Sequence, residues 1–168
     1  MSDASAHAPS PQRGLTLIEL LVTLSIMAIL LSIGFSGWQW IQREQLRSES
    51  KALISRLVEL RQLSIATRTN WALCPLGDST STCGDDWSRG YRWYRKDGAK
   101  SHAAGKHKIE GVTVSWNASG PVITFNWRPS APFTSYGSFS LCNGSGGNKI
   151  VINDAARSYL DQGGASSC

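Results

Sequence analysis

The chain has 168 residues, of which 41% are apolar, and it carries a formal net charge of +5. That length suits one globular domain with one additional element, and the composition excludes the collagen-like and disordered classes. Residues 70–168 hold ten Lys and Arg against seven Asp and Glu. This excess is compatible both with a solvated surface and with contact to nucleic acid or acidic surfaces, so charge alone decides nothing.

The first 14 residues, MSDASAHAPSPQRG, are polar and contain two prolines. They show no apolar periodicity and cannot build a core of their own. We interpret residues 1–14 as a removable leader.

Residues 15–35 are apolar apart from one charge, Glu19. About 20 such residues in a helix span the hydrocarbon core of a bilayer, and Trp38 and Trp40 follow where interfacial aromatic residues lie. Residues 15–38 are therefore expected to form a transmembrane helix. A secretory signal has a shorter apolar core preceded by positive charge. A plain single-pass anchor leaves Glu19 unexplained, because a carboxylate in the hydrocarbon costs about 2.5–3.5 kcal/mol.

The segment Arg13-Gly14-Leu15-Thr16-Leu17-Ile18-Glu19-Leu20 resembles the prepilin peptidase site of type IV pilins and type II secretion pseudopilins. The resemblance implies cleavage between Gly14 and Leu15 and N-methylation of Leu15, although most members have Phe where this chain has Leu15. It also implies that Glu19 pairs with the free α-amino group of a neighbouring subunit during assembly. The protein would then be a single-pass protein of the bacterial inner membrane, with its head in the periplasm, incorporated into a pilus or pseudopilus. Its partners would be the prepilin peptidase, other minor pilins or pseudopilins, and the major pilin.

Residues 39–69 have the pattern of an amphipathic helix. The apolar stripe contains Leu46, Leu53, Leu57 and Leu60, widened by Ile54, Val58 and Ile65, and charged residues lie opposite. No proline interrupts residues 15–69, so one long helix is expected.

From residue 70 the pattern changes to short β-rich runs separated by Gly, Asn, Asp, Ser and Pro. We expect strands at 70–74, 90–95, 108–116, 122–127, 138–142, 149–153 and 156–160, and a loop around His102 and His107. The predicted fold class is α+β: a long N-terminal helix, half transmembrane and half amphipathic, packed on a small antiparallel sheet or sandwich that forms the head at residues 70–168.

The four cysteines, Cys74, Cys83, Cys142 and Cys168, contain no C-x-x-C spacing, so a zinc site is not indicated. An even number behind an export-like N-terminus favours disulfides. Three connectivities are open. We favour Cys74–Cys83 and Cys142–Cys168, because each closes a loop rich in Gly, Ser and Asp; free buried thiols are the alternative.

Several segments of the head resemble the FimT, FimU and GspH branch of minor pilins. They are residues 60–68, Leu73-Cys74-Pro75, Cys83, Trp87-Ser88-Arg89-Gly90-Tyr91 and the part with Cys142 and Cys168. The resemblance implies a pilin-like fold and a minor pilin that primes or caps a type IV pilus. The alternatives are a GspH-type pseudopilin of a type II secretion system and a FimT-like DNA-binding pilin of natural transformation.

DNA binding in FimT-like pilins uses a Gly-Arg-x-Arg element, and the matching stretch here is Ala156-Arg157-Ser158-Tyr159. Arg157 alone is retained from that element. With Arg89 and Arg92 it makes a candidate set of DNA contacts, although backbone binding sums several phosphate contacts. We favour a hydrated surface or a subunit interface as the interpretation of these arginines over DNA binding.

No catalytic, phosphate-binding or dinucleotide motif occurs in the sequence, and His102 and His107 lack the spacing of helical metal ligands. The sequence therefore predicts a structural subunit, not an enzyme, with no catalytic residues, no metal site and no cofactor.

Overall fold

A computed structural model describes residues 16–79, 82–98, 100–128, 133–161, 164–165 and 168, without the side chains of 33–36. The chain divides into two compact units, Met1–Trp38 and Gln39–Cys168. The helix α1 (Leu17–Thr67) contributes residues to both.

Local features explain where α1 begins and where it ends. Thr16 precedes the helix and accepts its first backbone hydrogen bond, from the N–H of Leu20 to the Thr16 carbonyl at 3.2 Å. At the other end Arg68 has a φ of 50°, a left-handed conformation that cannot continue a right-handed helix. The long helix expected over 15–69 is thus present within two residues at each end.

The first sheet follows the helix directly and has the strand order β3-β2-β1-β5. Its members are β1 (Asn70–Pro75), β2 (Tyr91–Asp97), β3 (Lys100–His107) and β5 (Ile123–Phe125). All three pairings are antiparallel. The β2–β3 hairpin turns at Gly98, whose φ of 57° suits glycine.

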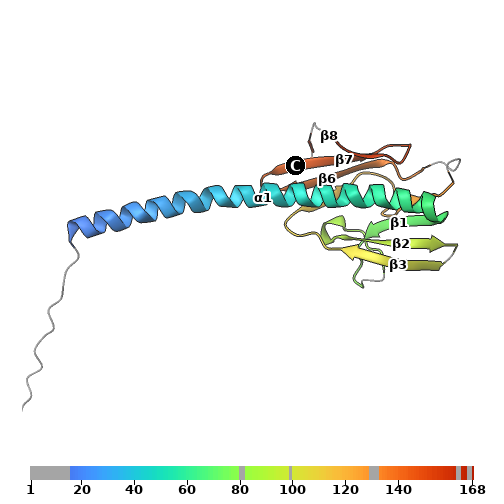
Figure 1. The fold of residues 1–168 in the computed structure, drawn as a ribbon, viewed down its shortest axis with the longest axis horizontal. Coiled ribbons are helices and arrows are strands. Elements are labelled where there is room, and N and C mark those ends of the chain that lie inside the picture. The colour runs from blue at the N-terminus through green and yellow to red at the C-terminus, as the bar shows by residue number, and fades with distance from the viewer. Residues whose placement is uncertain (1–15, 80–81, 99, 129–132, 162–163, 166–167) are drawn as a thin grey trace, which may run out of the picture. The chain divides into compact units, whose positions relative to one another are not determined.

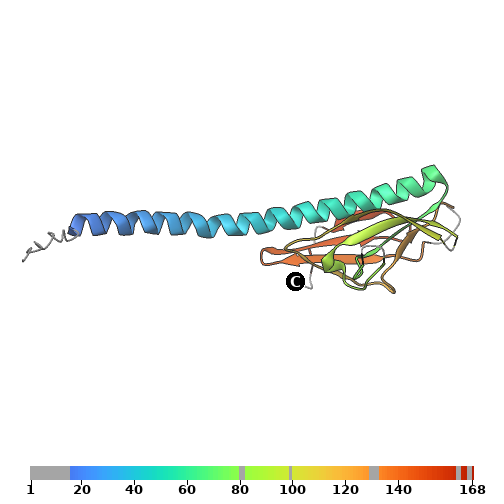
Figure 2. The same cartoon turned by 90° about the horizontal axis from the view of Figure 1, so that it is seen from below.

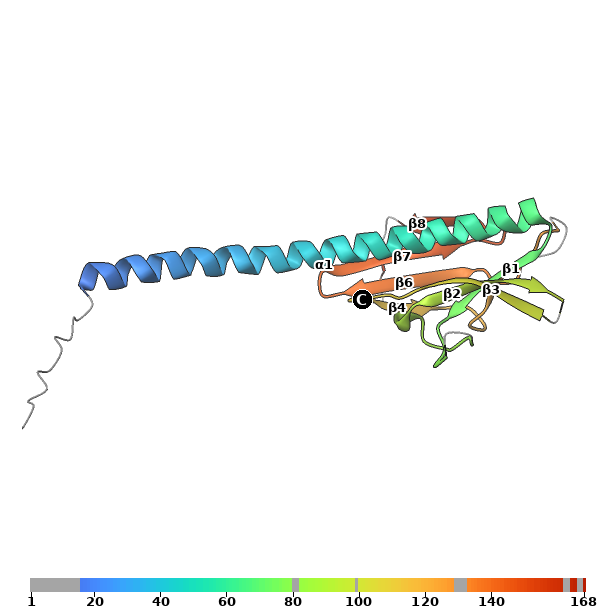
Figure 3. The same cartoon turned by 60° about the horizontal axis from the view of Figure 1, so that its bottom comes forward.

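The second sheet has the order β4-β6-β7-β8, and its pairings are also antiparallel. It comprises β4 (Thr113–Trp116), β6 (Gly137–Asn143), β7 (Gly146–Ile152) and β8 (Ser158–Asp161). Figure 3 shows β4 and β8 at opposite edges of this sheet. A short 3₁₀ helix, η1 (Trp87–Arg89), precedes β2.

The strand β3 corrects the sequence analysis, which expected a loop around His102 and His107. Its sequence, KSHAAGKH, has little β-propensity, yet it pairs with β2 from Lys100 to His107, with one irregularity in register opposite Trp93 and Tyr94. Gly105 lies against the Trp93 indole, and a Cβ at Gly105 would come within 2.2 Å of that ring. This glycine is therefore a packing requirement of the hairpin. The strand expected over 108–116 is also shorter, because β4 begins only at Thr113.

One hydrophobic core joins the helix to both sheets within residues 39–168. Figure 1 shows β1–β3 on one side of the C-terminal half of α1 and β6–β8 on the other; in Figure 2 the strands lie on a single face of that half. The helix contributes Leu46, Leu53, Leu57 and Leu60, each at most 6% exposed. The strands contribute Leu73, Tyr91, Val114, Ile123, Phe125, Phe139, Leu141, Ile150 and Ile152. The α+β fold class, a long helix on an antiparallel head, is confirmed.

The buried face of the helix is narrower than its sequence suggested. Val58 and Ile65 are exposed, at 38% and 59%, and lie outside the core. Ser50 and Ser64, which are polar, are buried on this helix. Their hydroxyls donate to the helix carbonyls of Leu46 and Arg61 at 2.7 Å, and Ser50 also accepts a hydrogen bond from Asn148 Nδ2 of β7 at 2.9 Å.

The cysteines are joined as Cys74–Cys83 and Cys142–Cys168, the pairing that the loop composition favoured. The first disulfide closes the loop between β1 and η1. The second ties the C-terminal Cys168 to β6. Both therefore fasten segments outside the regular strands to a sheet.

Candidate functional site

The helix α1 begins with a capping arrangement. The backbone N–H of Glu19 donates to Thr16 Oγ1 at 3.4 Å, and Glu19 is the acidic residue of the first helical turn. A Thr-x-x-Glu sequence at a helix start is the signature of a capping box, and a carboxylate there interacts favourably with the helix dipole. The residues Thr16-Leu17-Ile18-Glu19 display this signal in the sequence, although the helix was predicted from its apolar run alone.

The first part of the helix presents apolar side chains to its surroundings. Every large apolar residue from Leu17 to Leu31 is exposed, from 48% at Val22 to 83% at Leu17. A water-soluble domain does not leave such a continuous apolar surface uncovered. By length and composition α1 is able to cross a membrane, which is consistent with the expected anchor.

Polar groups in this apolar stretch are satisfied within the helix. The hydroxyls of Thr23, Ser25 and Ser32 donate to the backbone carbonyls of Leu20, Leu21 and Ile29 at 2.8–2.9 Å. Hydroxyls that bond to their own helix enter a lipid or protein environment at low cost.

Glu19 is the one charged residue in 15–42, and its side chain lies on the exposed surface of the helix. In a low-dielectric environment an ionised carboxylate needs a cation or several hydrogen bonds. Because Glu19 lies one turn from the helix start, an amine at the N-terminus of another helix is a chemically suitable partner. The expected cleavage residues, Gly14 and Leu15, lie outside the described residues.

The three arginines considered for DNA contact lie on or next to three different elements of the head. Arg92 lies in β2, is 5% exposed, and has its guanidinium 5.4 Å from the centroid of the Tyr94 ring. Arg89 ends η1 and pairs with Asp78 at 2.8 Å. Arg157 is exposed just before β8 of the second sheet. The structure therefore does not gather these arginines on one strand or in one sheet.

The turn before β8 holds Ala156 in a backbone conformation that is unusual for alanine. Ala156 has a φ of 54°, the left-handed region that glycine favours. Its N–H donates to the carbonyl of Asn153 at 2.9 Å, and Asn153 Oδ1 accepts from the N–H of Arg157 at 2.8 Å. The glycine-type conformation is thus held by the Asn153 turn although the residue is alanine.

The two histidines of β3 differ in their surroundings. His107 Nε2 contacts Glu49 Oε2 on α1 at 2.8 Å, whereas His102 is exposed. Within the described ranges no three His, Cys, Asp or Glu side chains form a group that could hold a metal ion.

Comparisons with known proteins agree with this picture. Residues 9–35 match the prokaryotic N-terminal methylation motif. No curated protein sequence matches the chain. Two crystal forms of the type IV minor pilin FimU of Pseudomonas aeruginosa are similar in structure. One matches at 21% identity with a TM-score of 0.58, covering 77% of this chain and 98% of FimU. The other matches at 22% identity with a TM-score of 0.56, covering 73% of this chain and 99% of FimU.

The similarity extends over nearly the whole of the solved FimU chain, so it concerns the fold of that solved chain as a whole. The methylation motif covers the segment where the helix starts. This chain is therefore pilin-like, with a prokaryotic N-terminal methylation motif joined to the fold of a type IV minor pilin.

Proposed function

We propose that this protein is a minor pilin that enters a type IV pilus through α1 and acts in the complex that primes or caps the filament. The proposal is supported by the methylation motif at 9–35 and by the similarity of the fold to that of FimU. The head lies in the periplasm in this proposal, because its two disulfides belong to an oxidising compartment.

Processing comes first. Cleavage between Gly14 and Leu15 leaves Leu15 as the new first residue, directly before the helix cap Thr16. Its α-amino group, methylated by the same peptidase, then lies at the start of α1. A free amine at this end adds positive charge to the positive end of the helix dipole, so the group attracts a carboxylate.

Assembly follows from the single observation that carries the proposal: Glu19 is the one charge in a long, exposed, apolar stretch. A carboxylate in the hydrocarbon costs about 2.5–3.5 kcal/mol. Pairing with the α-ammonium group of a neighbouring subunit neutralises both charges and also defines the axial position of one helix against the next.

The test replaces Glu19 in cells that make the major pilin. We expect Glu19→Ala to be processed normally, seen as the mass of a chain starting at Leu15, but to be missing from sheared filaments. Glu44→Ala is the matched control, because Glu44 is an exposed acid of the same helix outside the apolar stretch. Normal recovery of Glu19→Ala in filaments would refute the charge-pairing step.

Deletion of the gene for this protein in its native host distinguishes a type IV pilus subunit from a type II secretion subunit. A minor pilin of the priming complex is required for surface pili, so we expect a loss of pili with normal protein secretion. Loss of secretion with normal pili would instead assign the chain to a type II secretion system.

A further inference from the structure

Three basic residues follow the apolar stretch of α1 on one side of the helix. Arg43, Arg47 and Lys51 are exposed, and steps of four residues keep them on the same helix face. Trp40 precedes them on that face and is 69% exposed. All four residues belong to the unit Gln39–Cys168. We refer to Trp40, Arg43, Arg47 and Lys51 as the basic stripe.

The head leaves the basic stripe uncovered. The helix residues that enter the core at this level, Leu46 and Leu53, are at most 6% exposed and follow a separate stripe of the helix. In Figure 2 the strands lie on a single face of this half of α1. The face with the basic stripe is therefore open to another surface.

The head also provides no acidic partner for the stripe. None of the ion pairs within the described residues involves its three cations, and Glu44, the exposed acid beside it, offsets one of the three charges. The next two arginines of the helix differ, because the protein itself uses them. Arg56 pairs with Glu59 at 2.7 Å, and Arg61 donates to the carbonyl of Ala155.

The stripe directly follows the part of the chain that is expected to span the membrane. The apolar stretch ends at residue 35, and by length and composition α1 is able to cross a membrane. Tryptophan rings are enriched at the level of the lipid headgroups, and Arg and Lys extend along apolar surface to place their charge in the polar layer. Guanidinium and ammonium groups bind phosphate oxygens. The stripe thus matches an anionic lipid surface.

The position of these cations runs against the usual distribution of charge. Lys and Arg accumulate on the cytoplasmic side of membrane helices, and moving a cation outward opposes a membrane potential that is negative inside. In the proposed function the head lies outside the cytoplasm, so the stripe carries three cations on the disfavoured side. A contact with lipid phosphates on that side offsets this cost.

The length of the stripe decides how the helix must lie. At 1.5 Å per residue, Lys51 lies about 16 Å further along α1 than Trp40. The headgroup layer is only about 5–8 Å thick on each side of the hydrocarbon. A helix perpendicular to the membrane would place Lys51 beyond this layer. All three cations reach the phosphates together only when the helix is inclined with the stripe toward the lipid.

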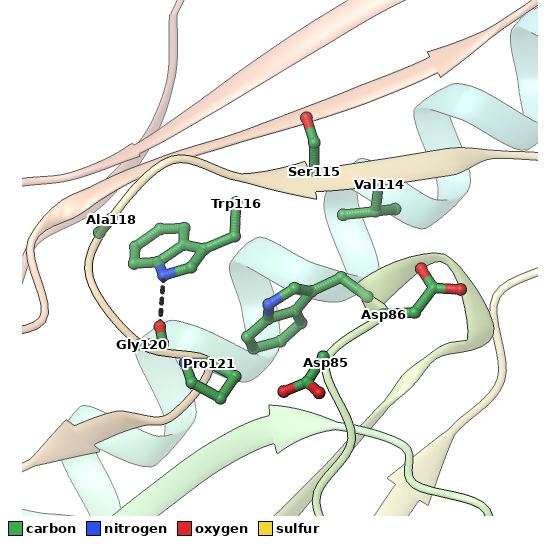
Figure 4. Close-up of a pocket in the computed structure, with 9 residues that line it drawn as sticks. Asp85, Asp86, Val114, Ser115, Trp116, Ala118, Gly120 and Pro121 are labelled. Carbon is green, nitrogen blue, oxygen red and sulfur yellow. Dashed lines mark hydrogen bonds between the residues drawn. The ribbon is translucent and has the colours of Figure 1, made fainter.

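The pocket of the head does not compete for phosphate. It has a volume of about 450 Å³ and lies beside η1 and the connection from β4 to β5. Figure 4 shows Asp85 and Asp86 among the residues that line it, and the lining includes no Lys, Arg or His. Carboxylates repel a phosphate group, so the basic stripe is the better site for an anionic headgroup.

We propose that the basic stripe binds the phosphate groups of anionic phospholipids on the side of the membrane that carries the head, and holds the unassembled subunit inclined on that surface. The side of the membrane and the state before assembly rest on the proposed function. The affinity of the stripe for anionic lipid does not.

The first experiment measures lipid binding by the full chain. Native mass spectrometry counts the phosphatidylglycerol molecules that the chain retains when it is released from maltoside micelles at increasing lipid concentration. Phosphatidylcholine with the same acyl chains is the control, because it carries a phosphate without net charge. The stripe variant, Arg43→Gln, Arg47→Gln, Lys51→Gln, keeps the helix since these positions are exposed and Gln is a good helix former.

We expect the native chain to retain phosphatidylglycerol in preference to phosphatidylcholine. The stripe variant should need about tenfold more phosphatidylglycerol for half-saturation. The matched control, Lys96→Gln, Lys100→Gln, Lys106→Gln, removes the same charge from exposed positions of β2 and β3 and should bind as the native chain does. Equal retention of both lipids by the native chain, or the same weakening in both variants, refutes the lipid site.

The second experiment tests the inclination. Reductive methylation with ¹³C-formaldehyde labels the lysines and keeps their positive charge, and Lys→Arg variants assign the signals of Lys51 and Lys100. In lipid nanodiscs, headgroups that carry a gadolinium chelate broaden the signals of nearby methyl groups. We expect stronger broadening of Lys51 in phosphatidylglycerol than in phosphatidylcholine, with no such difference for Lys100. Equal broadening of Lys51 in the two lipids contradicts the inclined position.

Recovery of the stripe variant in sheared filaments separates the lipid from another partner. Loss of this variant from filaments with unchanged lipid retention would overturn the lipid in favour of acidic residues on a neighbouring subunit. A failure of the Glu19 test with intact lipid binding would remove only the assignment to a pilus.

Discussion

The imidazole Nε2 of His107, the last residue of β3, lies 2.8 Å from Glu49 Oε2 on α1. These residues are 58 positions apart in the chain. The contact fastens the edge strand of the first sheet to the helix, next to the place where the Arg56 guanidinium stacks 3.7 Å from the centroid of the Trp93 ring. The β2–β3 hairpin is therefore held to the helix by polar contacts as well as by the core.

The first prediction concerns this contact. In a double-mutant cycle, Glu49→Ala and His107→Ala should show a coupling free energy of about 0.2–1 kcal/mol, because both side chains are only partly buried. Urea denaturation of residues 39–168, the unit that contains all the buried residues of the described core, measures it. The matched cycle with the exposed His102→Ala should show no coupling, and a zero value for His107 as well would contradict the contact.

The second prediction distinguishes two neighbouring helix positions. Leu57 is fully buried whereas Val58 is 38% exposed. Leu57→Ala should lower the free energy of unfolding by about 2–5 kcal/mol, through lost burial and the cavity left behind. Val58→Ala should change it by less than about 0.5 kcal/mol. Equal losses at both positions in urea denaturation would show that the helix buries a different face.

The third prediction is an alkaline loss of stability. Burial raises the pKa of the Tyr91 phenol above its ordinary value near 10. The folded state therefore keeps the phenolic proton at a pH where the unfolded chain releases it. The stabilisation is complete below pH about 10 and declines as the pH rises further toward the folded-state pKa.

Urea denaturation of residues 39–168 at pH 9 to 12 measures this decline, and Tyr91→Phe should make it shallower. Part of the slope should remain, because burial also raises the pKa of Tyr94. An unchanged slope in the Tyr91→Phe variant would show that this phenol does not titrate with unfolding.

The fourth prediction concerns processing. Gly14→Leu should block removal of the leader, because a bulky side chain then precedes the expected cleavage bond. The unprocessed chain would appear as a slower band and as the mass of the full 168 residues. Gly37→Leu is the matched control, since Gly37 lies beyond the methylation motif and a Cβ there meets open space. Cleavage of the Gly14→Leu variant at the normal rate would show that the processing site does not lie after Gly14.

Much of the fold could be predicted because the relevant patterns are local. The spacing of Leu46, Leu53, Leu57 and Leu60 identified the helix face that meets the core, since side chains three or four residues apart share one side of a helix. Alternation of apolar residues identified β5 and β6 for the corresponding reason in strands. The assignment of Val58 and Ile65 to the buried face was wrong. The width of the buried face depends on the sheets that cover the helix.

The strand β3 could not be predicted, because its residues are poor strand formers and its conformation comes from pairing with β2. The backbone of Gly105 fits under Trp93 only once that hairpin exists.

The sequence by itself determined the long helix, its exposed apolar start, the single acid Glu19 and the alternating segments of the head. These depend on hydropathy and periodicity, which each stretch of chain carries alone. Tertiary structure decided which of three cysteine pairings forms, which histidine meets Glu49, and that Asp85 and Asp86 share a pocket with Trp116. Cys142 and Cys168 are 26 residues apart and Glu49 and His107 are 58 apart. Only the packing of one common core brings such distant residues together.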